Sequence, residues 1–279
     1  PRRQNTNKEG GADMPNCLDS YPWRSLKGCG ALAPSMFNLG DFRNERLKDG
    51  TRVQFRIIGF RHDVTKSGRI LPLSWEMVDC LPKRHRWNSD DTNRGSWGAT
   101  ELFHKMNDEY GEIYQLMPAE ILEVVEPVIK LTANTYDGAN ELLETECKFW
   151  IKSEKETFGR NIYSAPGEGH WYEYYRQEDV PWGKKRNGSA EYTMLRSPSY
   201  YSSGAFCFVT ANGSAYYILR KEFLWRRPGF QLLICVSKAS APRKRCKIKQ
   251  QPLRQSLQWF YVHNGSNLLV VWADSRKTN

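Results

Sequence analysis

The sequence predicts an α+β fold with short strands, two or three helices and long loops. Apolar residues alternate over 53–57 and again over 73–77, and this period of two is typical of strands. Over 97–110 and 118–126 the apolar residues recur every three or four positions, which is the spacing of short amphipathic helices. Helices mixed with scattered short strands and long loops indicate an α+β domain.

The two predicted strands belong to one β-hairpin. Val53, Phe55 and Ile57 share a face of the first strand, because successive side chains of a strand point to opposite sides. Residues 66–68, with the sequence Lys-Ser-Gly, offer a turn before the alternation resumes. We therefore expect a half-buried hairpin here.

Each predicted helix has a recognisable start. Ser96 is the expected N-cap of the first helix, and Pro118 suits the first turn of the second. Ser153 and Glu156 have the spacing of a capping box, so a third helix should begin directly after a short buried strand at 149–151. The apolar face of the first helix would hold Trp97, Leu102, Phe103, Met106 and Tyr110.

The stretch over 192–230 is unusually rich in small and aromatic residues. Residues 205–219 predict a β-hairpin, because two runs of alternating residues flank Asn212-Gly213, the strongest short hairpin signal. If the small residues of the first strand face the core, Phe206 and Phe208 face the solvent.

Tyrosines and serines gather around this hairpin. Tyrosine with serine and glycine is the composition of antibody-like binding surfaces, where rigid rings give contact area at low entropic cost. The alternative is a strand pair buried on both sides, with the tyrosines in the core, and composition favours neither interpretation. The rings concerned are Tyr200, Tyr201, Phe206, Phe208, Tyr216 and Tyr217.

The framework of this stretch resembles a known family. The sequence LRSP at 195–198, followed by FC, V and NG and closed by RPGF at 227–230, is similar to the variable region of proteins diversified by retroelements in phages and bacteria. The resemblance implies a C-type-lectin-like fold of the formylglycine-generating-enzyme type. The match weakens after Leu219, so the later positions belong to the scaffold, or the chain is a relative that is not diversified.

The resemblance also implies a set of ligand-binding positions. In that family, scattered positions are rewritten by adenine-directed mutagenesis and contact the ligand. Carried over residue by residue, the positions are Ser199, Tyr200, Tyr201, Ser202, Ser203, Phe206, Phe208, Thr210, Ser214, Tyr216, Tyr217, Ile218 and Leu219.

A second resemblance covers most of the chain, from about 37 to 230. The segments SWEMVD at 74–79, SWGATELFHKMNDEY at 96–110 and FWIKSEKETFG at 149–159 resemble an uncharacterised domain of bacterial surface and prophage proteins. PAEILEVVEPV at 118–128 and EGHWYEYY at 168–175 fit the same domain.

These observations divide the chain into three parts. Residues 1–36 are polar and lack a periodic apolar pattern, so we expect an extended arm that orders only against a partner or is plainly disordered. The resemblance implies that residues 37–235 form a C-type-lectin-like domain. Residues 236–279 hold a basic segment and a predicted β-hairpin around Asn264-Gly265.

Charge is concentrated in the last part. The chain has a formal net charge of +10, and residues 236–279 contribute most of it, with nine basic residues against Asp274 alone. The main body is therefore not a polyanion-binding surface by charge. The basic run at 243–249 is a linker, a nucleic-acid contact or part of an assembly interface, and the linker is favoured.

Further rings lie in a loop-rich segment over 159–192. These aromatic side chains either form a second part of the binding surface or pin the loop to the core by packing against it. They are Trp171, Tyr172, Tyr174, Tyr175 and Trp182. Pinning is the preferred interpretation for Trp171 and Tyr174, and the sequence decides nothing for Trp182.

No catalytic or metal-binding motif is visible. The five histidines fit neither HExxH nor a zinc spacing, and His62-Asp63 and Asp90-Asp91 are interpreted as solvated turn residues. The seven cysteines form no CxxC pair and indicate buried thiols, although pairing of Cys17 with Cys29, or of Cys207 with Cys235, stays open. We expect no catalytic residue, no metal and no cofactor.

The expected function is non-catalytic recognition of a protein or glycan receptor on a host cell. The favoured location is a virion, as a tail or receptor-binding protein, or a cell surface. Homo-oligomers or virion neighbours would attach through the N-terminal arm and the C-terminal hairpin. No apolar run reaches the length of about 20 residues that a membrane span needs. The alternatives are a structural virion subunit and a nucleic-acid-associated protein that acts through the basic tail.

Overall fold

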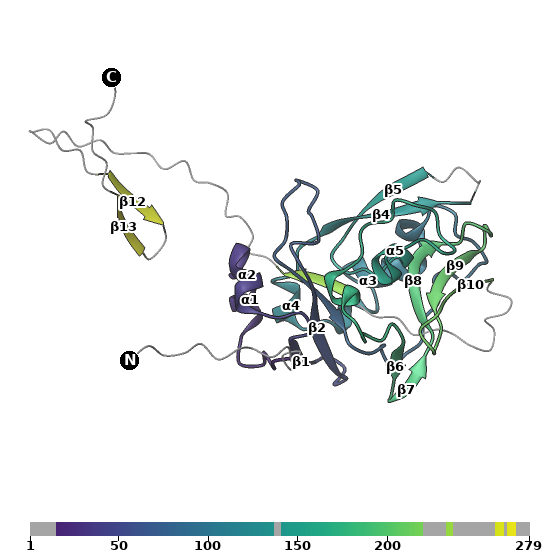
Figure 1. Cartoon of the computed structure of the whole chain (residues 1–279), viewed down its shortest axis with the longest axis horizontal. Helices are drawn as coiled ribbons and strands as arrows, with labels where there is room; N and C mark the ends of the chain where they lie inside the picture. The colour runs from purple at the N-terminus through teal and green to yellow at the C-terminus, as the bar shows by residue number, and fades with distance from the viewer. Residues whose placement is uncertain (1–14, 137–140, 220–232, 237–259, 265–266, 272–279) are drawn as a thin grey trace, which may run out of the picture. The chain divides into compact units, whose positions relative to one another are not determined.

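The computed structural model describes residues 15–136, 141–219, 233–236, 260–264 and 267–271 (Figure 1). Contacts divide the chain into two units, residues 1–239 and 240–279. The predicted boundary at 235/236 thus lies close to the boundary between the units.

A four-stranded antiparallel sheet with the order β1-β2-β3-β11 forms one part of the first unit. Its strands are β1 (Phe42–Arg46), β2 (Arg52–Phe60), β3 (Leu73–Met77) and β11 (Leu233–Val236). Strands β2 and β3 confirm the first predicted hairpin, with Ile57 opposite Trp75. The predicted turn forms at Gly68, whose positive φ of 78° favours glycine and whose N–H donates to the Thr65 carbonyl.

Within the described residues of this unit, the other strands form three smaller antiparallel sheets. The order β10-β9-β8 joins β8 (Thr193–Pro198), β9 (Ala205–Val209) and β10 (Ala215–Leu219). Two-stranded sheets pair β4 (Val128–Asn134) with β5 (Glu141–Cys147), and β6 (Lys184–Arg186) with β7 (Ser189–Glu191). The sheet β10-β9-β8 and the four-stranded sheet lie toward opposite ends of the unit (Figure 1).

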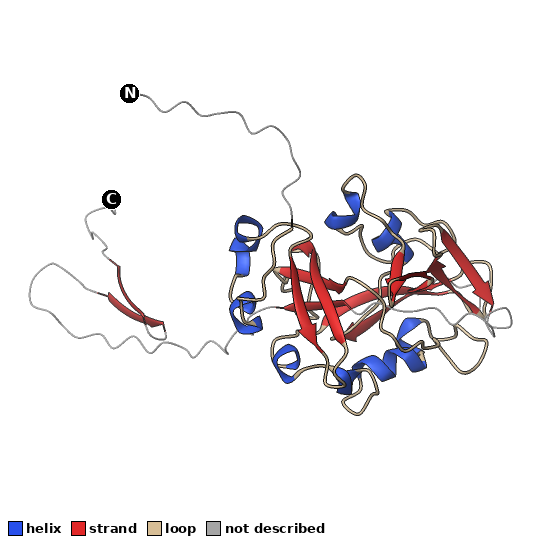
Figure 2. Cartoon of the chain, turned by 90° about the horizontal axis from the view of Figure 1, so that it is seen from below, coloured by secondary structure: helices blue, strands red, loops and turns tan. Residues whose placement is uncertain are grey.

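Short helices are placed around these strands (Figure 2). The α-helices are α1 (Trp23–Lys27), α2 (Ala33–Met36), α3 (Glu101–Asn107), α4 (Ala119–Leu122) and α5 (Glu154–Phe158). The 3₁₀ turns are η1 (Gly30–Leu32), η2 (Trp97–Ala99), η3 (Tyr114–Leu116) and η4 (Glu173–Arg176). Helices combined with several small antiparallel sheets confirm the α+β class.

The helix starts confirm one predicted cap and correct another. At α5, Ser153 and Glu156 form the predicted capping box. At α3 the cap is Thr100, whose side chain accepts from the Phe103 N–H, whereas Ser96 precedes a separate 3₁₀ turn. Tyr110 lies beyond the end of α3 and is 89% exposed, so it is not part of the apolar face.

The predicted strand at 149–151 is buried but is not a named strand. Phe149, Trp150 and Ile151 are all inaccessible, and only Trp150 forms a β-bridge, with Leu233 of β11. The apolar residues of this segment therefore serve the core, while its backbone leads directly into the cap of α5.

The prediction of an extended arm at 1–36 is wrong for residues 15–36. Leu18, Trp23, Leu26 and Ala33 are buried in the main core. Trp23 packs edge-on against Phe55 and Trp75, and its Nε1 donates to Glu45 at 2.7 Å. A few well-placed apolar side chains therefore order a segment that lacks periodicity. Residues 1–14 lie outside the described residues.

The prediction that Phe206 and Phe208 face the solvent is also wrong. Each is 3% exposed, and both belong to the core cluster that includes Phe55 and Trp75. The other face of β9 is buried too, because Cys207 and Val209 pack with Phe158 and Leu195. Strand β9 is thus buried on both faces, as the alternative interpretation of a strand pair buried on both sides held. The alternation of side chains along a strand does not show which of its faces is exposed.

The second unit contains the predicted C-terminal hairpin. Strands β12 (Phe260–Asn264) and β13 (Asn267–Val271) pair antiparallel, with Asn264 opposite Asn267. The basic run at 243–249 lies outside the described residues. No helix in the described part of the chain has the length and apolar character of a membrane span.

Candidate functional site

Five tyrosines form a contiguous group, called here the tyrosine cluster: Tyr163, Tyr200, Tyr201, Tyr216 and Tyr217. Tyr200 is 55% exposed, Tyr201 63% and Tyr216 49%. They come from the 199–205 loop and from β10, while Tyr163 comes from the loop after α5. The predicted hairpin therefore does present a surface of exposed rings, but it uses its loop and its outer strand rather than β9.

The rings of the cluster contact one another closely. Tyr163 lies at the centre, with ring centroids 5.1 Å from Tyr217, 5.9 Å from Tyr216 and 6.4 Å from Tyr201. Tyr216 and Tyr217 are stacked at 5.8 Å, and Tyr200 meets Tyr201 edge-on at 5.6 Å. Mutual packing limits the rotamers of these rings, so less entropy is lost when they contact a ligand.

The predicted polar positions are divided between surface and core. Ser203 and Ser214 are exposed, and Ser202 and Thr210 are half-buried. Ser199 is fully buried, and its hydroxyl accepts from the Tyr201 N–H. Ser199, Phe206 and Phe208 are therefore unable to contact a ligand directly, which corrects three predicted binding positions. Ile218 and Leu219 lie in β10, and their side chains lie outside the described residues.

Sequence reasoning did not include Tyr163 in the surface. This residue lies well before the 192–230 stretch, and no local pattern marks it. The buried carboxylate of Glu154 holds its loop by accepting from the backbone N–H groups of Ile162, Tyr163 and Ser164. The joining of this loop to the hairpin is a tertiary contact that the sequence alone does not indicate.

The aromatic residues of the 159–192 segment are mostly structural. Trp171 and Tyr174 pack against a core cluster that includes Trp150 and Tyr172, and Trp171 Nε1 donates to the Thr157 carbonyl at 3.0 Å. This confirms the pinning role predicted for both. Trp182 is partly exposed and packs edge-on against Phe158.

His62 and Asp63 are not solvated turn residues, contrary to the prediction. Asp63 is buried and bonds to Lys130, Ser74 and Tyr172. The His62 ring stacks on Tyr172 with centroids 3.9 Å apart. Burial raises the pKa of the Asp63 carboxyl, but the Lys130 ammonium and His62 outweigh it and hold that pKa below the ordinary value.

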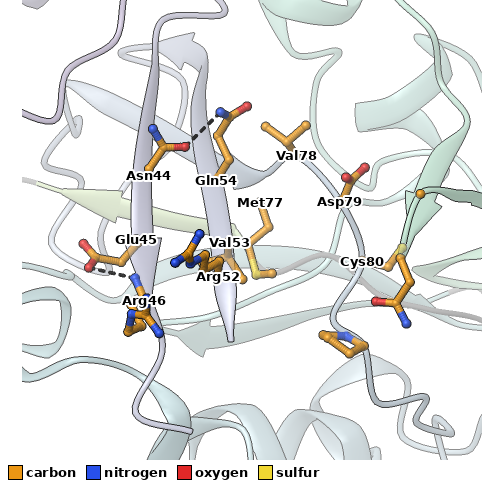
Figure 3. A pocket seen from close by; sticks show the side chains of 13 residues that line it. Asn44, Glu45, Arg46, Arg52, Val53, Gln54, Met77, Val78, Asp79 and Cys80 are labelled. Atoms are coloured by element: carbon orange, nitrogen blue, oxygen red, sulfur yellow. Dashed lines mark hydrogen bonds between the residues drawn. The ribbon is translucent and has the colours of Figure 1, made fainter. Parts of the chain in front are cut away.

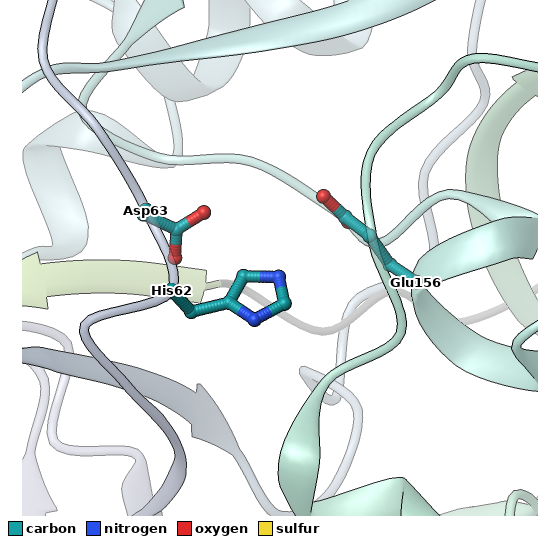
Figure 4. A group of neighbouring side chains, drawn as sticks. All are labelled: His62, Asp63 and Glu156. Atoms are coloured by element: carbon teal, nitrogen blue, oxygen red, sulfur yellow. The ribbon is translucent and has the colours of Figure 1, made fainter. Parts of the chain in front are cut away.

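His62, Asp63 and Glu156 could form a three-ligand metal site by geometry alone. Their ligand atoms lie within 4.8 Å of one another, and Glu156 on α5 faces the segment that carries His62 and Asp63 (Figure 4). The Lys130 Nζ, however, bonds to Asp63 and lies 3.0 Å from Glu156 Oε1. An ammonium therefore already neutralises both carboxylates, and the donor set fits a buried ion-pair network better than a metal.

Arg196, the arginine of the LRSP framework, connects this network to β8. Its guanidinium is fully buried, bonds to both oxygens of Glu156 and donates to the Glu168 carbonyl at 3.1 Å. Although burial raises the pKa of Glu156, Arg196 and Lys130 lower it to about 2. The ion pair of Arg196 and Glu156 thus holds the strand that leads into the 199–205 loop.

A second buried network lies beneath the four-stranded sheet. Glu76 of β3 is fully buried and accepts from Arg56, Lys152 and Lys184. The Tyr175 hydroxyl also donates to it, at 2.6 Å. Burial opposes ionisation, but the three cations keep the pKa of Glu76 well below its ordinary value. Removal of Glu76 would leave the buried cations Arg56, Lys152 and Lys184 without their shared carboxylate.

A polar groove of about 750 Å³ lies apart from the tyrosine cluster and shares no residue with it. Its walls come from β1, β2, the 77–82 segment and the turn at Asn187 and Gly188. Figure 3 shows Asn44 and Gln54 joined by a hydrogen bond on one side, with Asp79 and Cys80 on the segment opposite. No aromatic ring lines it, so it lacks the ring contacts expected of the predicted binding surface.

The cysteines decide the pairings that the sequence left open. Cys17, Cys29, Cys207 and Cys235 are all free thiols, so neither pairing forms. Cys207 and Cys235 are buried, and burial raises the pKa of both thiols well above the ordinary value. These thiols are protonated, unreactive parts of the core.

Comparison with known proteins assigns a family and no activity. Residues 68–234 match the family described as "Domain of unknown function (DUF6273)". No curated protein and no solved structure matches the chain. Since the match spans more than half of the sequence, the chain belongs to the DUF6273 family.

Proposed function

We propose that this chain is a non-catalytic ligand-binding protein and that the tyrosine cluster is its contact surface. The observation that carries the proposal is the gathering of Tyr200, Tyr201 and Tyr216 in one group, because each exposes about half of its side chain or more. Single exposed rings are common on protein surfaces, whereas contiguous ones mark interaction sites. Tyrosine is well suited to this role because its ring is rigid and its hydroxyl bonds to many partners.

The proposed partner is a protein or glycan receptor on a host cell. Serine and threonine hydroxyls at Ser202, Ser203, Thr210 and Ser214 surround the rings and supply adaptable hydrogen bonds. None of the cluster and its polar neighbours carries a formal charge, so recognition would depend on ring contact and hydrogen bonding rather than on electrostatic steering.

The C-type-lectin-like fold and a diversified surface are part of the same proposal. They are supported by the LRSP to RPGF framework and by the location of the exposed positions in one loop and one strand. The expected setting is a virion or a cell surface of phage or prophage origin.

The test is a binding panel with the full chain labelled by a fluorophore. The probes are intact bacterial cells of many strains and an immobilised glycan set. The double variant Tyr201→Ser/Tyr216→Ser should lose most of the signal on every probe that binds wild type. Tyr110→Ser is the matched control, because Tyr110 is the most exposed tyrosine outside the cluster among the residues whose exposure the structure describes.

The proposal fails if the double variant binds like wild type while the protein binds its probe specifically. In that case the contact surface lies elsewhere, for instance in the groove between the β1–β2 hairpin and the 77–82 segment.

Sequencing of the encoding locus in many isolates tests the diversified surface separately. Substitutions should concentrate at exposed positions such as Tyr200, Tyr201 and Tyr216 and should spare Phe206 and Phe208. An invariant stretch would instead indicate a binding protein of fixed specificity.

A further inference from the structure

The loop at 199–205 carries Tyr200 and Tyr201, the two most exposed rings of the cluster. Besides the Tyr163 carbonyl, its hydrogen bonds to described residues outside the loop reach two residues far away in the sequence. These are Asn93, in the loop before η2, and Thr135, which follows β4. Both are buried.

Asn93 holds the far side of the loop. Its Nδ2 lies 2.9 Å from the Ser202 carbonyl oxygen and 3.1 Å from the Ala205 carbonyl oxygen. Its own backbone N–H donates to the Ser203 carbonyl at 2.9 Å. One residue thus binds three carbonyl groups of the loop.

Thr135 holds the near side of the loop. Its hydroxyl donates to the Ser199 carbonyl at 2.9 Å and lies 3.1 Å from Asn93 Nδ2, whose two N–H groups are shared among this hydroxyl and the two loop carbonyls. The two residues therefore form one connected unit beneath the loop. The loop also closes on itself, because the Ser199 N–H donates to the Ala205 carbonyl at 2.9 Å. The Tyr200 N–H donates to the Tyr163 carbonyl at 2.8 Å, which brings the two tyrosine-bearing loops together.

Every one of these anchors acts on the main chain of the loop. Within the described part of the chain, no hydrogen bond uses the side chain of Tyr200, Tyr201 or Ser203. Because each residue type has the same carbonyl and, proline excepted, the same N–H, side chains at these three positions can change without loss of an anchor. Ser202 differs, since its hydroxyl accepts from the Gly204 N–H at 3.4 Å.

We propose that Asn93 and Thr135 are positioning residues that fix the 199–205 loop through its main chain. Tyr200, Tyr201 and Ser203 are then specificity-determining positions whose exchange leaves the loop conformation intact. The second statement rests on the proposed function, whereas the first concerns the loop alone.

Hydrogen–deuterium exchange with mass spectrometric detection tests the positioning role without any ligand. Overlapping peptides over 199–205 report on the amides of Ser199, Tyr200 and Ala205, and peptides over 73–77 report on the core. Thr135→Val removes the hydroxyl at nearly constant volume, and Asn93→Ala removes the side-chain donor. Thr135→Ser restores the hydroxyl and serves as the conservative control.

Exchange of the loop amides should accelerate about tenfold or more in Thr135→Val and Asn93→Ala, because loss of a buried hydrogen bond favours local opening. Thr135→Ser should retain protection, and so should the triple variant Tyr200→Ala/Tyr201→Ala/Ser203→Ala. The core peptides should be unchanged in all four.

Unchanged loop exchange in both Thr135→Val and Asn93→Ala would overturn the proposal, as would loss of protection in the triple variant. An acceleration shared equally by the core peptides would also overturn it, because the pair would then support the whole domain. Failure of the proposed function has a different signature: the loop would behave as described here, and the tyrosine variants would bind every probe normally.

Discussion

Phe206 and Tyr201 are nearby aromatic residues that should respond in opposite ways to replacement by alanine. Phe206 is 3% exposed, and its ring stacks on Trp87 with centroids 5.4 Å apart and planes 7° from parallel. Tyr201 is 63% exposed and contacts only the rings of its own cluster among the aromatic residues described. Comparison of these two variants therefore distinguishes a core position from a surface position within residues 192–230.

The magnitudes follow from this difference in burial. Truncation of a buried phenylalanine to alanine costs about 3–5 kcal/mol, because transfer free energy is lost and a cavity remains. Phe206→Ala also removes the ring that covers Trp87, so we expect a value within this range. Replacement of an exposed side chain costs about 0.5 kcal/mol, and loss of exposed ring contacts adds roughly as much again. The two variants should thus differ by about 3 kcal/mol.

Urea denaturation followed by circular dichroism and tryptophan fluorescence measures both values by linear extrapolation. Tyr110→Ala provides the baseline for an exposed tyrosine. If Tyr201→Ala destabilises the protein as much as Phe206→Ala does, the tyrosine cluster is part of the core and the proposed surface is wrong. If Phe206→Ala costs less than about 1 kcal/mol, the assignment of β9 to the core is wrong.

Substitutions of three buried polar residues, Glu168, Lys130 and Ser153, test the hydrogen bonds and ion pairs that hold the segments next to the tyrosine cluster. Burial raises the pKa of the Glu168 carboxyl to about 7, although the hydrogen bond from Ser197 and the charge of Arg196 act in the opposite direction. The protonated Glu168 side chain therefore stabilises the folded state fully below its ordinary pKa of 4.5, and this stabilisation is lost as the pH rises through 7. The free energy of unfolding of wild type, minus that of Glu168→Gln, should fall by about 3 kcal/mol between pH 4 and pH 8, and a flat difference would contradict the raised pKa. Lys130→Met should cost about 3–5 kcal/mol in urea denaturation, because it leaves Asp63 as an uncompensated buried carboxylate, and Lys130→Met/Asp63→Asn should recover part of that loss if the reasoning is right. Ser153→Ala removes the cap of α5 and should lower the free energy of unfolding by about 1 kcal/mol, whereas Ser153→Thr should be nearly neutral; equal effects of the two would argue against the capping bond.

Local features of this fold could be predicted from the sequence because their signals depend on neighbouring residues. The turn at 66–68, the hairpin around Asn212-Gly213 and the C-terminal hairpin each follow from turn chemistry between alternating runs. The capping box at Ser153 and Glu156 follows from a fixed spacing.

Burial could not be predicted in the same way, because it depends on what covers each face. The alternation in β9 correctly placed Phe206 on the face opposite to Cys207. It did not indicate that both faces of this strand are buried. The segment 15–36 has no periodicity, yet Trp23 fits between Phe55 and Trp75. Asp63 looked like a solvated turn residue because its partner, Lys130, lies on a distant strand.

The candidate site was predictable only in part. The resemblance to the retroelement-diversified proteins indicated Tyr200, Tyr201, Tyr216 and Tyr217, whereas the tyrosine and serine composition by itself favoured neither a surface nor a core position. It gave no indication of Tyr163, Asn93 or Thr135, whose positions are set by contacts between loops that are far apart in the sequence.

The central claim, that exposed tyrosines form the contact surface, is tested most directly by a dissociation constant. The labelled full chain is titrated onto the cell strain that gives the strongest specific signal, for wild type, Tyr201→Ala and Tyr110→Ala. We predict that Tyr201→Ala weakens binding about tenfold or more while its free energy of unfolding stays close to that of Tyr110→Ala. An unchanged dissociation constant for Tyr201→Ala, in protein of normal stability, would contradict the claim.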